Sequence, residues 1–181
     1  MRPTFPPADL VIGITPFLEP DAGLAEALCR AGALGVLDLG TGDRHAREQL
    51  AALRERAPGR FGLRVQPGCR LSPADLDTPG AAAPHTLVLP ADLPGWDLGP
   101  LGTRYRLLAE VTDLAQARAA VGAGAHGLIA RGAESGGRVG ELSTFVLLQQ
   151  LLGAPELGVP VWACGGIGPR TAAAAVAGGA A

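Results

Sequence analysis

Residues 126–153, HGLIARGAESGGRVGELSTFVLLQQLLG, contain the pattern that decides the fold. The stretch begins with a short apolar run at 126–132, which is typical of a buried strand. A loop with two adjacent glycines and one arginine follows at 133–140. The segment 141–153 then has the apolar face of a helix. A strand, a glycine-rich loop and a helix in this order predict one βα unit of a larger α/β fold.

The same strand–helix order recurs along the whole chain. Helices follow most of the apolar runs, and the clearest, at 43–57, has Ala and Leu on one face and Arg and Glu on the other. Thr112 or Asp113 is the expected N-cap of the helix in 113–125. Residues 69–85 leave room for one short helical turn, and 91–102 are expected to be a loop without a clear helix. The expected strands are 9–15, 34–40, 60–68, 86–90, 104–112, 126–132 and 159–168.

Seven consecutive βα units predict a parallel sheet with helical crossovers. Two architectures fit this pattern, a (β/α)₈ TIM barrel and an open doubly wound sheet. Repeats of about 25 residues favour the barrel, although a barrel needs eight strands. We therefore expect one domain over residues 1–181, an incomplete (β/α)₈ TIM barrel of about seven βα units that lacks strand eight. The end of the chain, AVAGGAA, is of a kind that leads into a strand, so we expect the domain to be truncated there.

Composition excludes several classes of function. The chain has 181 residues, of which 48% are hydrophobic, and a net charge of −2, which gives no electrostatic case for binding nucleic acid or an anionic membrane. Its three cysteines are far apart and form no CxxC motif, so neither a metal site nor a disulfide framework is expected. No apolar stretch approaches the roughly 20 residues of a membrane span. The start lacks the pattern of a signal peptide, so a cytoplasmic location is expected.

Two glycine-rich loops follow consecutive expected strands, AESGGRVG at 133–140 and CGGIGPR at 164–170. Adjacent glycines lack Cβ atoms, so their backbone N–H groups can approach a flat ring or an anion. The second loop leads into a helix whose first N–H groups favour a phosphate. Barrel enzymes place their sites at the carboxyl ends of the strands, where both loops are expected. The alternative is that both are only tight βα turns.

The segments GAGAHGLIARGAESGGRVGE (122–141) and VPVWACGGIGPRTAAAAVAGGAA (159–181) resemble the nitronate monooxygenase (2-nitropropane dioxygenase) family, which is similar to the flavin-dependent enoyl-acyl reductases. The resemblance covers most of the chain; it is strongest over 111–181 and weak over 69–102. It implies a barrel that binds FMN without a covalent bond. Carried over, Gly136 and Gly137 would lie by the flavin and Gly165 and Gly166 would hold its phosphate, while Thr15 and Pro16 would stand in the loop that meets the isoalloxazine.

The chain departs from the family pattern at the residue after the two glycines. The family has a histidine there that serves as the catalytic base, and this chain has Arg138. Arginine stays protonated and cannot take a proton at neutral pH, although it can hold a carboxylate, an enolate or a phosphate. We therefore assign Arg138 to binding of the substrate anion. Arg64 stands where the family often has an asparagine that contacts FMN, and GITPF (13–17) replaces Ala-Pro-Met.

An arginine in this motif resembles more closely the barrel domains of polyketide and polyunsaturated fatty acid synthases. That resemblance implies a small-molecule or acyl-carrier-linked substrate and further domains of a multidomain synthase as partners. The three histidines, His45, His85 and His126, are expected to be structural or solvated. Other polar candidates for the catalytic end are Asp38, Gln66, Asp92, Glu110, Glu134, Ser135 and Cys164, with Glu134 expected to accept hydrogen bonds from the glycine loop or to pair with Arg138 or Arg131.

Three hypotheses follow. The first is an FMN-dependent oxidoreductase of the monooxygenase or enoyl reductase type. The second is a catalytically degenerate barrel that acts as a structural or docking module of a polyketide or fatty acid synthase. The third is a different phosphate-binding barrel, such as an isomerase or a synthase, which the Gly-Gly-Ile turn alone permits and ESGGRVGE argues against.

Overall fold

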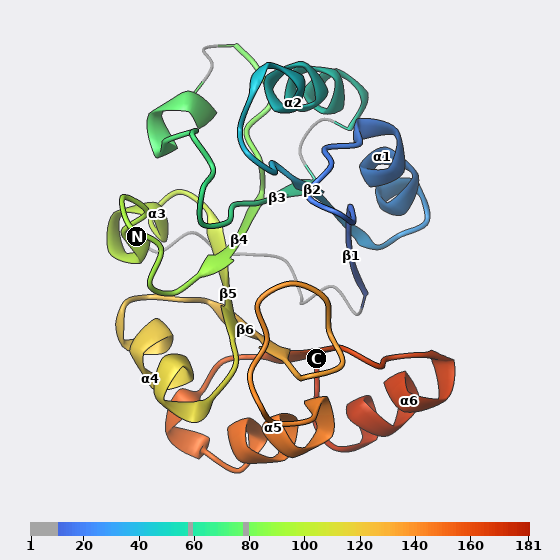
Figure 1. The fold of residues 1–181 in the computed structure, drawn as a ribbon, viewed down its shortest axis with the longest axis vertical. Helices are drawn as coiled ribbons and strands as arrows, with labels where there is room; N and C mark the ends of the chain where they lie inside the picture. Colours follow the sequence, from blue (N-terminus) through green and yellow to red (C-terminus); the bar gives the residue numbers. More distant parts are fainter. Residues whose placement is uncertain (1–10, 58–59, 78–79) are drawn as a thin grey trace.

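Seven parallel strands run through the middle of the molecule, and helices lie around their outer side (Figure 1). The computed structural model describes residues 11–57, 60–77 and 80–181. The strands pair in chain order, from β1 to β7, without a reversal. Their bounds are β1 Ile12–Ile14, β2 Leu34–Asp38, β3 Phe61–Arg64, β4 Thr86–Pro90, β5 Arg106–Val111, β6 Gly127–Arg131 and β7 Val161–Cys164.

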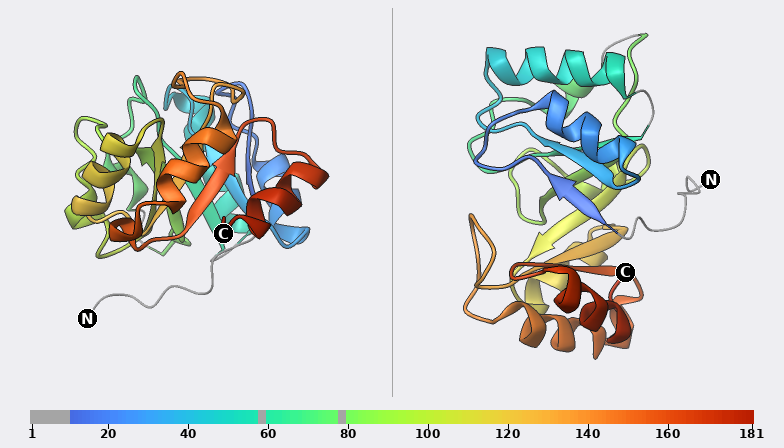
Figure 2. Two further views of the ribbon diagram at one scale, coloured as in Figure 1. Left: turned by 90° about the horizontal axis from the view of Figure 1, so that it is seen from below. Right: turned by 90° about the vertical axis from the view of Figure 1, so that its right-hand side faces the viewer.

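A helix follows most of the strands, as expected from the alternation in the sequence. The helices α1 and α2 lie at one end of the molecule, and α5 and α6 lie at the other (Figures 1 and 2). The α-helices are α1 Ala22–Arg30, α2 Arg44–Arg56, α3 Leu98–Leu101, α4 Leu114–Gly122, α5 Thr144–Leu152 and α6 Pro169–Ala177, and the 3₁₀ helices are η1 Pro73–Leu76 and η2 Pro155–Leu157.

The strand order decides between the two expected architectures. An open doubly wound sheet reverses its strand order at a switch point, whereas this sheet curls from β1 to β7 in sequence. The prediction of an incomplete (β/α) barrel of seven units is therefore confirmed. The first expected strand began at residue 9, and its first two positions lie outside the described residues.

The barrel is open between β1 and β7. Among the described residues, no ladder joins these two strands, and a mostly apolar groove of about 970 Å³ lies there. Ile12 and Ile14 line it from β1, Trp162 from β7 and Ala172 from α6. The N–H of Ala181 donates a hydrogen bond to the carbonyl oxygen of Val161 at 2.9 Å, so the last residue pairs with the start of β7.

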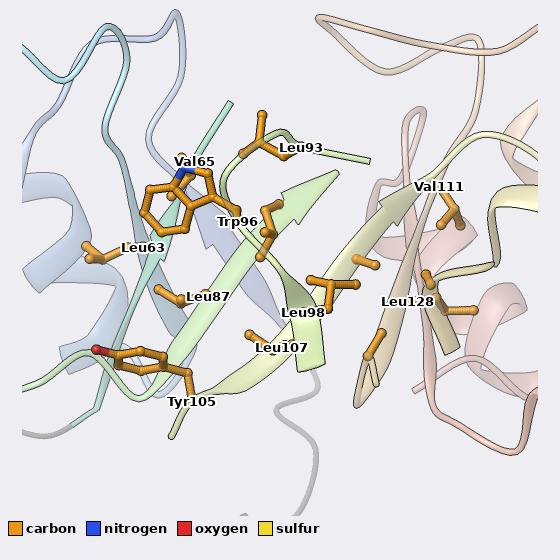
Figure 3. Packing of buried hydrophobic residues seen from close by; sticks show 14 of the residues in the cluster. Leu63, Val65, Leu87, Leu93, Trp96, Leu98, Tyr105, Leu107, Val111 and Leu128 are labelled. Carbon is orange, nitrogen blue, oxygen red and sulfur yellow. The ribbon is translucent and has the colours of Figure 1, made fainter. Parts of the chain in front are cut away.

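The main core lies between the outer face of the sheet and the helices. Strands β2 to β6 are buried along their whole length, because helices cover one face and the curled sheet encloses the other. Leu87 of β4 and Leu107 of β5 are register partners on this outer face, with Trp96 and Leu98 of the following connection packed near them (Figure 3). A smaller apolar cluster fills the inner face, and its buried members are Leu34, Val36, Val88, Leu108, Ile129 and Trp162.

Local sequence signals explain where several helices begin. The Asp113 side chain accepts the backbone N–H of Gln116, which confirms it as the N-cap of α4. The short helical turn expected in 69–85 is η1. The expectation of no helix in 91–102 is wrong, because Asp97 caps the short helix α3 by accepting the N–H of Gly99. A single turn of this length has too few residues to show helical periodicity in the sequence.

Candidate functional site

Four strands end in buried charged residues on the inner face of the sheet. Asp38, Arg64 and Arg131 are the last residues of β2, β3 and β6, and Glu110 is the next to last of β5. All four are at most 9% exposed. Side chains two residues apart on a strand point to the same face, so this layer lies directly above apolar residues of the inner cluster such as Ile129. The barrel therefore has an apolar floor and a charged layer at the carboxyl ends of its strands.

The four charges alternate and are joined in one chain of hydrogen bonds. Arg64 donates from one terminal nitrogen to Asp38 Oδ2 at 2.9 Å and from the other to Glu110 Oε2 at 3.0 Å. Arg131 donates to the second oxygen of Glu110 at 2.5 Å. Gln66 adds a hydrogen bond to Asp38 Oδ2 at 2.6 Å. Two guanidinium groups and two carboxylates balance, so the layer has no net charge.

Both arginines of this layer have an unused donor. The Nε atoms of Arg64 and Arg131 are buried and have no hydrogen-bond partner among the described residues. A buried N–H without an acceptor is unfavourable by about 1–3 kcal/mol, so buried donors of this kind are uncommon in folded proteins. The charged layer therefore keeps two N–H donors for which the described part of the protein supplies no acceptor.

The loop after β1 supports this layer from the side. The Thr15 hydroxyl accepts a hydrogen bond from the N–H of Asp38 at 2.9 Å, and Thr15 is 1% exposed. The next residue, Pro16, is exposed. Phe17 and Leu18 follow with φ angles of 63° and 61°, and the Phe17 side chain is 87% exposed. Positive φ is uncommon for bulky residues, so this loop stores backbone strain at the mouth of the barrel.

The two glycine-rich loops lie against each other, as their positions on consecutive strands predict. The N–H of Gly132 donates to the carbonyl oxygen of Cys164 at 3.1 Å. Gly165 has a φ of 114°, and a Cβ atom there would lie 2.7 Å from both the backbone nitrogen of Ser135 and the hydroxyl oxygen of Thr144. Only glycine fits this contact, because the left-handed backbone and the close approach both exclude a side chain.

The adjacent glycines of the β6 loop lie above the charged layer. Arg131 donates a hydrogen bond from its other terminal nitrogen to the carbonyl oxygen of Gly136. Gly137 has a φ of 80°, and a Cβ atom there would lie 3.3 Å from the same guanidinium. Gly136 and Gly166 are exposed, and Gly166 lies on the β7 loop next to Glu134. The structure thus brings the two glycine pairs together at the carboxyl end of the barrel.

Glu134 connects the β6 loop to α5, a role that the sequence did not predict. Its carboxylate accepts hydrogen bonds from the backbone N–H of Thr144 at 2.9 Å and from the Thr144 hydroxyl at 3.0 Å. The bond from the backbone N–H is the main reason why the pKa of Glu134 lies below its ordinary value. The expected pairing with Arg138 or Arg131 is wrong, because Arg131 binds Glu110 and Arg138 faces Asp92. Helix α5 has no hydrogen bond from its own N-cap side chain, so Glu134 takes that place.

Thr144 is a residue of the site that sequence reasoning missed. It is 1% exposed, and its hydroxyl lies within hydrogen-bond distance of both the Glu134 carboxylate and the carbonyl oxygen of Cys164 at 3.2 Å. It thereby links the β6 loop, the start of α5 and the end of β7. A threonine just inside the start of a helix is common, so the sequence had no signal for this contact.

Arg138 lies at the exposed tip of the β6 loop. Its guanidinium is 3.6 Å from a carboxylate oxygen of Asp92, which follows β4, and both side chains are more than 60% exposed. The exposed Arg138 cation, close to the buried charged layer, is placed to meet a ligand that enters from solvent.

The Cys164 thiol lines the apolar groove, and burial raises its pKa.

Two of the three histidines lie at the other end of the barrel. His85 and His126 directly precede β4 and β6, and the Nδ1 atom of His126 accepts the backbone N–H of Leu107. His45 is in the first turn of α2.

Within 11–57, 60–77 and 80–181, no group of three or more His, Cys, Asp or Glu side chains is arranged to hold a metal ion. None of the helices in the described part of the chain is both long and apolar enough to span a membrane.

Solved structures share this fold over nearly the whole chain. FabK from Thermotoga maritima matches 95% of this chain and 56% of its own length, with 27% identity and a TM-score of 0.72. A nitroalkane oxidase from Streptomyces ansochromogenes matches 94% of this chain and 63% of its own length, with 24% identity and a TM-score of 0.72. A mandelate oxidase variant matches 94% of this chain at 20% identity and a TM-score of 0.66. No protein-family model and no curated protein matches the sequence.

These matches confirm the family resemblance that the sequence predicts. The similarity to FabK extends to the sequence, whereas the matches to the two oxidases show a shared fold. The chain spans 56 to 63% of the length of FabK and the nitroalkane oxidase. The fold is therefore that of the larger part of a barrel of this group.

Proposed function

We propose that this chain is the barrel of an FMN-dependent oxidoreductase of the enoyl reductase or nitronate monooxygenase type. The observation that carries the proposal is the meeting of two glycine loops above a buried layer of charged residues with two unused N–H donors. The structural neighbours are FMN-dependent enzymes, so FMN is the cofactor that the comparisons support.

The residues present fit such a cofactor. A flavin ring has several hydrogen-bond acceptors, and the Nε atoms of Arg64 and Arg131 are buried donors without partners in the described structure. Gly136 and Gly137 leave room for a flat ring beside bare backbone. Gly165 and Gly166 precede α6, whose first-turn N–H groups lack intrahelical acceptors and favour a phosphate. When bound, FMN would supply the electron transfer.

The chain's own residues would bind and orient the substrate. Arg138 stays protonated and exposed at the mouth, where it attracts a carboxylate, an enolate or another anion. It cannot act as a base, so we propose a reaction that needs no proton abstraction by this residue. Reduction of the carbon–carbon double bond of an enoyl substrate, either free or linked to an acyl carrier, meets that condition better than nitronate oxidation. Further domains of a multidomain synthase and a cytoplasmic location belong to the same proposal.

A second candidate is a catalytically degenerate barrel that serves as a docking module of such a synthase. It is favoured by the arginine at the position of the family's catalytic histidine, together with the placement of His85 and His126 before their strands, at the other end of the barrel. Binding of FMN separates the two candidates, because a docking module has no need to retain a flavin site.

The test is a titration of FMN with the purified protein, followed by quenching of flavin fluorescence. We expect saturable binding of one FMN per chain. Gly166→Ala should weaken it about tenfold, because a methyl group would stand at the proposed phosphate site. Gly158→Ala is the matched control, since Gly158 has a similar φ, 58° against 63°, and lies before β7 at the other end of the barrel. Absence of binding, or equal effects of the two substitutions, would contradict the proposal.

A further inference from the structure

Arg131 is placed to connect the buried core of the barrel to the glycine loop. One terminal nitrogen binds Glu110 on the neighbouring strand β5, and the other donates to the carbonyl oxygen of Gly136 in the loop. Arg131 is the last residue of β6 and is 6% exposed. A planar guanidinium that uses both ends in this way fixes the distance and the direction between its two partners.

The core end of this connection is held firmly. Glu110 also accepts from Arg64, which in turn binds Asp38. Asp38 accepts further hydrogen bonds from Gln66 and from the N–H of Gly40 at 2.8 Å. Breaking one pair would leave a buried charge without its partner, which costs several kcal/mol. Arg131 therefore projects from a rigid support.

The loop end has few other hydrogen bonds, although Gly140 packs closely against Thr112 after β5. Residues 132–135 are tied by hydrogen bonds from the N–H and hydroxyl of Ser135 to the carbonyl oxygen of Gly132. For residues 136–140, the bond from Arg131 to Gly136 is the one hydrogen bond to the rest of the protein within the described structure, apart from the exposed ion pair of Arg138. The guanidinium also packs below Gly137, where a Cβ atom would approach it to 3.3 Å.

We propose that Arg131, held by Glu110, is a positioning residue that fixes the course of residues 136–140 and thereby prepares the mouth of the barrel for its ligand. The part of this inference that concerns FMN rests on the proposed function. A loop that already has its bound conformation loses less entropy when it binds, so the contact raises affinity without touching the cofactor. It also sets where Arg138, next to Gly137, presents its charge.

The experiment compares Arg131→Lys with Arg64→Lys by limited tryptic cleavage after Arg138, without FMN, with the cleaved bond identified by mass. Both substitutions replace a guanidinium that binds Glu110, but only Arg131 contacts the loop. Lysine keeps the charge and has a single ammonium group, so it cannot bridge Glu110 and Gly136 as the planar fork does. We expect the cleavage rate after Arg138 to rise about tenfold in Arg131→Lys, because cleavage follows the population of the released loop and one charge-assisted hydrogen bond is lost, and to stay within about twofold in Arg64→Lys. An unchanged cleavage rate in Arg131→Lys, or an equal rise in both variants, would overturn the proposal.

A second variant covers the case in which Arg131→Lys does not fold. The double variant Glu110→Gln/Arg131→Gln removes one charge of each sign and leaves Arg64 paired with Asp38. It should release the same loop residues, and a cleavage rate after Arg138 equal to that of the unaltered protein would also overturn the inference.

A parallel FMN titration keeps the two proposals apart. We expect Arg131→Lys to weaken FMN binding about tenfold. An unchanged FMN affinity in a variant whose loop is released would refute the link to the cofactor. If the unaltered protein does not bind FMN, the proposed function fails, while the cleavage comparison still decides whether Arg131 holds the loop.

Discussion

The two faces of the curled sheet are built from different kinds of residue. The outer face packs against the helices through a large cluster that is apolar throughout, with Leu63, Leu87 and Leu107 among its fully buried members. The inner face has a small apolar cluster and, above it, the paired charges of four strands. The outer face stabilises the fold, whereas the inner face holds the groups that can bind a ligand. Substitutions on the two faces should therefore differ in their effects on stability and on ligand binding.

The largest effect is expected from Glu110→Ala on the inner face. Glu110 accepts hydrogen bonds from Arg64 and Arg131, so its loss leaves two buried guanidinium groups without that partner. Removing one partner of a buried ion pair costs about 3–5 kcal/mol. Urea unfolding should show this loss of stability. Glu156→Ala, which removes a carboxylate from an exposed pair with Arg118, is the control and should change little. Similar stabilities of the two variants would show that the inner charges are not essential to the fold.

A smaller difference should separate two neighbouring leucines of β5. Leu107 belongs to the outer cluster and Leu108 to the inner one, and both are fully buried. Leu107→Ala should cost about 3 kcal/mol in the free energy of unfolding, because the helices above it leave a cavity that cannot collapse. Leu108→Ala should cost about 2 kcal/mol, since its side chain packs beside Trp162, which lines the open groove.

The measurement for this pair is again urea unfolding, with far-UV circular dichroism to confirm that both variants fold. A larger loss in Leu108→Ala would contradict the view that the outer face dominates stability. Because the two positions are adjacent on one strand, differences in strand propensity cancel in the comparison.

Arg138→Ala should affect ligand binding with little effect on stability. Its guanidinium is exposed and 3.6 Å from Asp92, a surface pair that contributes little to folding. We expect the Kd for an anionic substrate analogue, such as a short acyl carboxylate, to rise about tenfold, while the Kd for FMN stays within about twofold. Fluorescence titrations measure both. Equal weakening of the two ligands would remove the role assigned to Arg138.

The fold was predictable from the sequence because its signals are local. Apolar runs, turn residues and helix caps such as Asp113 follow one another in a regular order along the chain, and this order locates the strands well. The charged layer was harder to predict from the sequence. Arg64 and Glu110 are 46 positions apart, and their pairing depends on how the sheet curls. One signal did exist, since a charged residue ends the otherwise apolar strands β2, β3 and β6. The contact between Glu134 and Thr144 had no such signal, because it depends on the path of the loop.

The smallest effect is expected from Glu134→Gln, which tests the link between the β6 loop and α5. The pKa of Glu134 is held below its ordinary value of 4.5, first by the hydrogen bond from the backbone N–H of Thr144. A lowered pKa in the folded state means that the carboxylate stabilises the fold above its unfolded pKa, and that this contribution is lost as the pH falls through the folded value. The stability difference between the unaltered protein and Glu134→Gln should therefore be present at neutral pH and disappear in acid. Glu141→Gln, which alters an exposed acid directly after this loop, is the control and should change the stability little. A difference that persists at low pH would mean that the shape of the Glu134 side chain, and not its charge at the start of α5, holds the loop in place.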